Sequence, residues 1–179
     1  MIKRLYIILY LFISFGFSFS QTELFFPSDM YMGSSVINDL IQDKWGRIWI
    51  ATQSGLISYD SHEFRTYSTP ELKSVQVHRI CEDHYGRLFI GTAAGIQRFD
   101  PATKHFTEVV LMRDRRNGGN ITNAKNNCFI ASLYCRKNGD MLIGTTGFGV
   151  FTLKPGENTA WYADEMIPNP ELIAVNDIV

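Results

Sequence analysis

The sequence predicts an all-β fold: a partial β-propeller of about three four-stranded blades and the start of a fourth, behind a signal peptide. Two observations carry this prediction. Residues 38–60 (NDLIQDKWGRIWIATQSGLISYD) recur at an offset of 40 as residues 78–100 (HRICEDHYGRLFIGTAAGIQRFD), with seven of 23 positions identical and no gap. Aromatic residues make up 13% of the chain, which favours β-structure over a helical bundle. A repeat of about 40 residues with four short strands is typical of propeller blades.

The first twenty residues match the three-part pattern of a secretory signal peptide. Lys3 and Arg4 provide a positive start, an apolar run covers residues 5–19, and Ser20 is a small residue directly before the expected cleavage at Gln21. The rival interpretation is an uncleaved membrane anchor, which needs about 20 apolar residues. Because the run is shorter than that, we expect an exported chain whose mature form begins at Gln21.

Each copy of the repeat reads as four short strands joined by tight turns. In the first copy, residues 36–42 form one strand, DKWG forms a turn, and residues 47–52 form a second, almost continuously apolar strand. Asp at the first position and Gly at the fourth suit a type I turn. A continuous apolar strand needs cover on both faces, which neighbouring blades provide. In the second copy, residues 100–103 (DPAT) are predicted to form the last turn.

A third, weaker copy occupies residues 132–155 (SLYCRKNGDMLIGTTGFGVFTLKP). It has one extra residue before Gly149, and Arg136 replaces the turn aspartate, but Asn138-Gly139 is a strong hairpin signal. The final residues, LIAVNDIV, resemble the start of the first copy. The predicted organisation is a signal peptide (1–20), an N-terminal segment (21–35), blade 1 (36–76), blade 2 (77–110), an inserted inter-blade loop (111–128), blade 3 (129–165) and the start of blade 4 (166–179).

Charge and cysteine usage exclude several kinds of site. The net charge of -1 argues against a nucleic-acid partner, which would require a basic face. Cys81 falls inside an apolar strand pattern and is interpreted as a small buried residue. Cys128 and Cys135 bracket a predicted strand, and an extended strand would hold them too far apart to bridge. There is no Cys-x-x-Cys and no His/Cys cluster with zinc spacing, so we expect no metal and no cofactor.

The segments DKWGRIWIATQSGLISYD and DHYGRLFIGTAAGIQRFD resemble the two-component regulator propeller repeat. The resemblance covers about residues 36–155. It implies the periplasmic part of a hybrid two-component sensor histidine kinase of the Bacteroidetes type. In that family such propellers precede a β-sandwich module, a membrane span and a cytoplasmic kinase, and their ligands are often oligosaccharides. The resemblance further implies a homodimer in the full-length form, anchored in the inner membrane only through the downstream region.

One connection between blades is enlarged and is the candidate ligand site. Gly86 and Gly139 are 53 residues apart, against 40 for the preceding pair, so about 13 residues are inserted within residues 111–127. Long loops on a rigid scaffold often carry function. Arg113, Arg115 and Arg116 could bind an acidic sugar or a sulfate through forked hydrogen bonds, although a solvated loop is the simpler interpretation. Phe148 could stack on a sugar ring, or it could be a packing residue.

Three functions remain open at this stage. A sensor input region is favoured by the repeat, with no catalytic residue in this chain. An enzyme similar to the streptogramin-cleaving propeller lyases would need a histidine and acidic residues that converge at the top of the inner strands. A secreted binding or structural propeller is the third. Three blades and a stub cannot close a ring, which typically has four to eight blades, so we expect isolated residues 21–179 to be poorly soluble.

Overall fold

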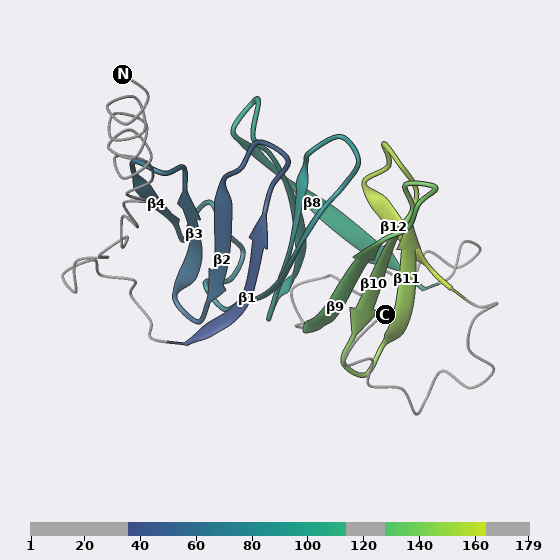
Figure 1. Cartoon of the computed structure of the whole chain (residues 1–179). Helices are drawn as coiled ribbons and strands as arrows, with labels where there is room; N and C mark the ends of the chain where they lie inside the picture. The colour runs from purple at the N-terminus through teal and green to yellow at the C-terminus, as the bar shows by residue number, and fades with distance from the viewer. Residues whose placement is uncertain (1–35, 114–127, 164–179) are drawn as a thin grey trace, which may run out of the picture. The chain divides into compact units, whose positions relative to one another are not determined.

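The computed structural model describes residues 36–113 and 128–163, and these form twelve β-strands (Figure 1). The predicted signal peptide, most of the predicted insertion and the predicted start of blade 4 lie outside the described residues. Within the described ranges no helix is long and apolar enough to cross a membrane. The strands are β1 (Ile37–Gln42), β2 (Ile48–Thr52), β3 (Gly55–Tyr59), β4 (Phe64–Tyr67), β5 (Val77–Glu82), β6 (Leu88–Thr92), β7 (Gly95–Asp100), β8 (His105–Met112), β9 (Ile130–Cys135), β10 (Met141–Thr145), β11 (Gly149–Leu153) and β12 (Thr159–Tyr162).

The strands form three antiparallel units of four, each in sequence order, so the predicted all-β fold with four strands per repeat is confirmed. Strands β1–β4 form one sheet. The second and third units join into one eight-stranded sheet, because β8 pairs in parallel with β12. We call the units β1–β4, β5–β8 and β9–β12 blades 1, 2 and 3.

The joining of blades 2 and 3 was not predicted, and it depends on the length of β8. The antiparallel pairing of β8 with β7 ends at Val109, opposite Ile96. The next three residues of β8 continue beyond β7 and pair with residues 159–161 of β12. Figure 1 shows β8 as a long arrow that runs from blade 2 to β12. Nearby, the Arg98 guanidinium donates to the carbonyl of Glu157 at 3.0 Å and to the Asn158 side chain at 2.7 Å.

The second strand of each blade is buried, as its apolar sequence predicts. Every residue of β6 (LFIGT) and β10 (MLIGT) is buried, and four of the five residues of β2 are buried. One apolar cluster lies between blades 1 and 2 around Trp49, whose ring centroid is 5.5 Å from that of Phe99. A second cluster lies between blades 2 and 3 around Phe151 and Ile130. Each blade therefore shields the inner strands of its neighbour.

The predicted turns between the first and second strands form in all three blades. Gly46, Gly86 and Gly139 each have a φ near +86° and donate to the carbonyl three residues earlier, at 2.9 Å. Arg136 in the third copy leaves this geometry intact, because the turn hydrogen bond uses only backbone atoms. The turn after β7 is longer than the predicted residues 100–103. It closes from the Lys104 amide to the Asp100 carbonyl at 2.8 Å, with Lys104 at φ +58°.

Candidate functional site

The loops at one end of the blades lie together, and we call this end the hairpin face. The Ala93 amide donates to the carbonyl of Gln76, at 3.1 Å, and the Thr146 amide donates to the carbonyl of Phe129, at 3.0 Å. These bonds tie hairpins to connections between blades, so both kinds of loop lie on one face. The hairpin face comprises the hairpins at 53–54, 93–94 and 146–148, the connection at 68–76, and the described ends of the enlarged connection, 113 and 128–129.

A buried threonine fixes each hairpin of this face. The hydroxyls of Thr52, Thr92 and Thr145 donate to the carbonyls of Gly55, Gly95 and Gly149 at 2.7–2.8 Å. All three threonine side chains are buried. The bond persists in the third blade, although its hairpin is one residue longer. These hydrogen bonds therefore join the two ends of each hairpin.

Arg113 lies at this face, directly after β8, and its side chain is exposed. Its guanidinium carbon lies 5.9 Å from the ring centroid of Tyr162, the last residue of β12. A cation over an aromatic face at this distance is attracted by the ring quadrupole. The other two arginines of the predicted cluster, Arg115 and Arg116, lie outside the described residues.

Phe148 lies in the hairpin that precedes β11, and it is half-buried against the apolar cluster between blades 2 and 3. Tyr162 packs against the same cluster. The Tyr162 ring also lies over Gly149, the residue that follows Phe148. A Cβ atom on Gly149 would stand 2.8 Å from the Cε2 atom of Tyr162. The structure thus brings Arg113 and Phe148 to the same end of blade 3, where Tyr162 lies against Arg113 and against Gly149, the residue after Phe148.

Tyr162 is the residue of this site that sequence reasoning missed. Its hydroxyl is buried and has no hydrogen-bond partner among the described residues. A buried hydroxyl normally finds a partner, so this oxygen is an unusual feature of the site. The sequence feature that could have pointed to Tyr162 is Gly149. A glycine directly after the extra residue of the third copy indicates that another group approaches the backbone closely.

A histidine occupies the same face at the start of blade 2. His78 is half-buried, and its ring centroid lies 4.0 Å from that of Phe129. Its Nε2 atom has no hydrogen-bond partner among the described residues. Burial, and then the charge of Arg79, lower the pKa of His78. The imidazole is therefore held toward its neutral form beside an aromatic ring.

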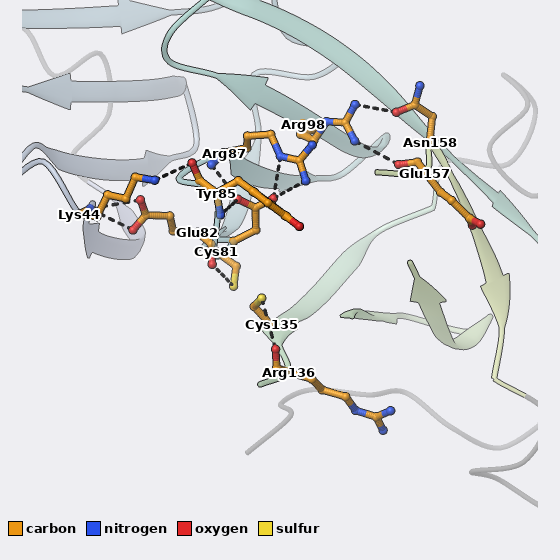
Figure 2. A network of polar contacts seen from close by, with 11 residues as sticks. Lys44, Cys81, Glu82, Tyr85, Arg87, Arg98, Cys135, Arg136, Glu157 and Asn158 are labelled. Atoms are coloured by element: carbon orange, nitrogen blue, oxygen red, sulfur yellow. Dashed lines mark hydrogen bonds and ion pairs between the residues drawn. The ribbon is translucent and has the colours of Figure 1, made fainter. Parts of the chain in front are cut away.

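The opposite end of the blades, the turn face, holds the DKWG and DHYG turns and residues 136–139 (Figure 2). Trp45 and Tyr85 are exposed there, each with a cationic side chain 4.5–4.9 Å from its ring centroid. A Cβ atom on Gly86 would stand 2.4 Å from the Trp45 ring, so Trp45 rests against the next turn. Trp45 therefore braces the turn at Gly86. His84 contacts the carbonyl of Arg136 through Nε2 at 2.8 Å.

The comparison with protein-family models matches two segments of the chain. The model described as two component regulator propeller matches residues 31–54 and 71–94. Each of these two segments is similar to the repeat that this model describes. The two matched segments overlap the first and second copies of the repeat, and they contain the DKWG and DHYG turns and the second strands, β2 and β6, of blades 1 and 2. Among curated proteins, none matches the chain.

Solved structures of β-propellers share the fold of this chain. The extracellular domain of a hybrid two component system from B. thetaiotaomicron matches with a TM-score of 0.56 and 21% identity over 72% of the chain. PorZ, a surface component of the type-IX secretion system of Porphyromonas gingivalis, matches with a TM-score of 0.58 and 12% identity over 77%. Virginiamycin B lyase from Staphylococcus aureus matches with a TM-score of 0.50 and 12% identity over 66%.

The chain spans only part of each of these proteins. It covers 18% of the B. thetaiotaomicron domain, 22% of PorZ and 38% of the lyase. At these identities the likeness establishes the propeller fold and leaves function to the residues.

Proposed function

We propose that this chain is part of the ligand-sensing propeller region of a two-component sensor, located in the periplasm, and that it senses without catalysing a reaction. The match of its two clearest repeats to the two component regulator propeller model carries this proposal. The likeness of its fold to an extracellular domain of a hybrid two component system supports it, as does the signal-peptide pattern of residues 1–20.

We further propose that the ligand is a carbohydrate with acidic groups, bound at the hairpin face of blade 3. The support is the exposed Arg113 guanidinium beside the Tyr162 ring. A guanidinium binds carboxylate or sulfate groups through paired hydrogen bonds. The aromatic ring of Tyr162 next to it offers an apolar surface. Arg115 and Arg116 follow closely in sequence and add positive charge.

Binding of oligosaccharides to the whole extracellular region tests this proposal. Calorimetry would compare a panel of acidic and sulfated oligosaccharides with their neutral counterparts. We expect an acidic member to bind, and Arg113→Gln to weaken its binding about 10- to 100-fold, because one charge-assisted contact contributes roughly 1.5–3 kcal/mol.

Arg65→Gln is the matched control, since Arg65 is also an exposed arginine over a tyrosine ring, 4.9 Å from the Tyr67 centroid, but lies within β4. It should leave binding unchanged. Equal loss in both variants, or no discrimination between acidic and neutral sugars, would contradict the proposed site.

The runner-up is a secreted propeller enzyme related to the lyases, or a secreted binding propeller without a kinase. The enzyme is favoured only by the likeness of the fold to virginiamycin B lyase, and this likeness identifies no catalytic residue in the chain. The histidine at the start of β5, the first strand of blade 2, is His78, and its ring lies 4.0 Å from the Phe129 ring between centroids. Cleavage of a streptogramin by the purified protein would establish the enzyme.

A further inference from the structure

The contact between blades 2 and 3 differs from the contact between blades 1 and 2 at two positions. Strand pairing sets Glu82 opposite Leu88, and it sets Cys135 opposite Met141 at the same place in the next blade. Between blades 1 and 2, the Glu82 carboxylate accepts from the Lys44 amide at 3.0–3.1 Å. Between blades 2 and 3, a cysteine therefore stands where a carboxylate stands one blade earlier.

The residue that faces Cys135 from blade 2 is a second cysteine. Cys81 is at the end of β5, one residue before Glu82, and Cys135 is the last residue of β9. Both are half-buried and pack against the apolar cluster between blades 2 and 3. Figure 2 shows their sulfur atoms pointing toward one another from the two strands. In the first copy of the repeat, the position of Cys81 is an isoleucine, Ile41.

Neither thiol is engaged in a strong interaction that would oppose pairing. The Cys81 thiol donates to the Glu82 carbonyl and the Cys135 thiol to the Arg136 carbonyl, each at 3.7 Å. A thiol is a weak donor, so these bonds are readily given up. None of the three cysteines, all of which lie in the described part of the chain, is in a disulfide.

The third cysteine is excluded from this pair by its place in the fold. Cys128 precedes β9, whereas Cys135 ends it. An extended strand advances about 3.3 Å per residue, so the two lie roughly 20 Å apart. The Cys128 side chain is fully buried. A disulfide requires Cα atoms within about 7 Å, which leaves Cys81 as the partner of Cys135.

We propose that Cys81 and Cys135 are an oxidisable pair, and that a disulfide-bearing oxidant closes a bond between them which joins β5 of blade 2 to β9 of blade 3. The oxidant is a small-molecule or protein disulfide, such as oxidised glutathione. One protein thiolate attacks the oxidant and releases one reduced thiol, leaving a mixed disulfide. The second protein thiolate then attacks the mixed disulfide at the protein sulfur and releases a second reduced thiol. The protein sulfurs are oxidised, the oxidant is reduced, and the two thiol protons pass to the leaving groups.

The environment sets the order and speed of these steps. Burial raises the pKa of the Cys81 thiol to about 11. Burial also raises the pKa of Cys135, but a backbone hydrogen bond from His84 opposes this. Because the thiolate is the attacking species, closure should be slow at neutral pH, should accelerate with rising pH, and should begin at Cys135. An exported protein meets an oxidising compartment, where such a bond persists once formed.

Peptide mapping of the whole protein after incubation with oxidised glutathione at alkaline pH tests the pair. Trypsin releases Cys81 in residues 80–87 (ICEDHYGR), and it releases Cys128 and Cys135 together in residues 126–136 (NNCFIASLYCR). A second digestion with chymotrypsin, which cuts after Phe129, separates these two cysteines. We expect one cross-linked product, two hydrogens lighter than the sum of its peptides, that contains Cys81 and Cys135. Glutathione adducts or free thiols alone at both positions would overturn the proposal.

Three variants and one condition make the assignment specific. Cys81→Ser should lose the cross-link and accumulate a glutathione adduct at Cys135, and Cys135→Ser should lose the cross-link as well. Cys128→Ala should retain it. Protein unfolded in urea should give a mixture of pairings that includes Cys128. An equal yield of the Cys81–Cys135 product in folded and unfolded protein would show that the fold does not direct the pair, and the proposal would fail.

Discussion

At the scale of single residues, one buried carboxylate organises each of the first two turns. Asp43 accepts from the amides of Trp45 and Arg47 through one oxygen and from the Trp49 indole, at 2.8 Å, through the other. In blade 2 the residue at the Trp49 position is Phe89, which has no donor. There the second oxygen of Asp83 accepts from the Arg87 side chain at 2.7 Å instead.

Replacing this carboxylate should destabilise the fold more than replacing an exposed one. Asp43→Ala leaves a buried indole N–H and two turn amides without their acceptor, so we expect a loss of about 3 kcal/mol in the free energy of unfolding. Asp60→Ala is the control, because its exposed carboxylate accepts two amides in a similar way and its loss should be much smaller. Urea unfolding measures both. Equal losses would mean that burial of Asp43 does not matter.

His78 should make stability depend on pH. Its pKa is lowered in the folded state, chiefly by burial, so the unfolded chain binds a proton more readily. Stability from this group is present above the unfolded pKa, near 6.5, and is lost as the pH falls below it. We expect the free energy of unfolding of the wild type to fall more than that of His78→Gln between neutral and mildly acidic pH. Thermal unfolding measures the stability of both proteins at each pH. If stability fell equally with pH in the two proteins, this prediction would be contradicted.

At the scale of strands, the contact of β6 with β9 is closer than the repeat pattern alone requires. Gly91 of β6 is buried, and a Cβ atom there would stand 2.6 Å from Cγ2 of Ile130. The same position in blade 1 is Ala51, which is fully buried, so a methyl group fits between blades 1 and 2. The absence of a side chain at Gly91 therefore sets the approach of blade 3 to blade 2.

Gly91→Ala should consequently destabilise the protein by about 1–3 kcal/mol through overpacking. The double variant Gly91→Ala/Ile130→Ala tests the cause. Removal of the Ile130 methyl groups relieves the clash, so the combined loss should be smaller than the sum of the two single losses. Chemical denaturation gives all three values. Simple additivity would show that the clash with Ile130 is not the source of the effect.

The sequence was informative where structure depends on local pattern and uninformative where it depends on distant contacts. The burial of β6 and β10 followed from their continuous apolar residues, and the turns at Gly46 and Gly86 followed from their composition. The pairing of β8 with β12 did not, because parallel pairing joins strands from different repeats. The contact of Tyr162 with Arg113 and the contact between Cys81 and Cys135 also join different repeats, so they were not predicted either.

At the scale of the whole molecule, blade 1 exposes apolar side chains on its first strand. Leu40 of β1 is 55% exposed and Ile37 is 48% exposed. Exposed apolar patches on sheet strands favour association with other chains. The expected poor solubility of residues 21–179 is consistent with this surface and stays a prediction.

Sedimentation of isolated residues 21–179 should therefore show association that increases with concentration. Leu40→Lys should reduce the association, because it places a charge on the exposed patch of β1. Tyr85→Lys is the matched control, since Tyr85 is 64% exposed but lies on the turn face, and it should have little effect. A monodisperse wild-type preparation would contradict the prediction.

Reading the gene past the codon for Val179 tests the central claim, a sensor propeller, most directly. We expect further repeats of about 40 residues, enough to close at least one ring of four to eight blades, followed by an apolar helix of spanning length and a histidine kinase. A reading frame that stops after a single ring, with no spanning helix and no kinase, would contradict the sensor and favour a secreted binding protein or lyase.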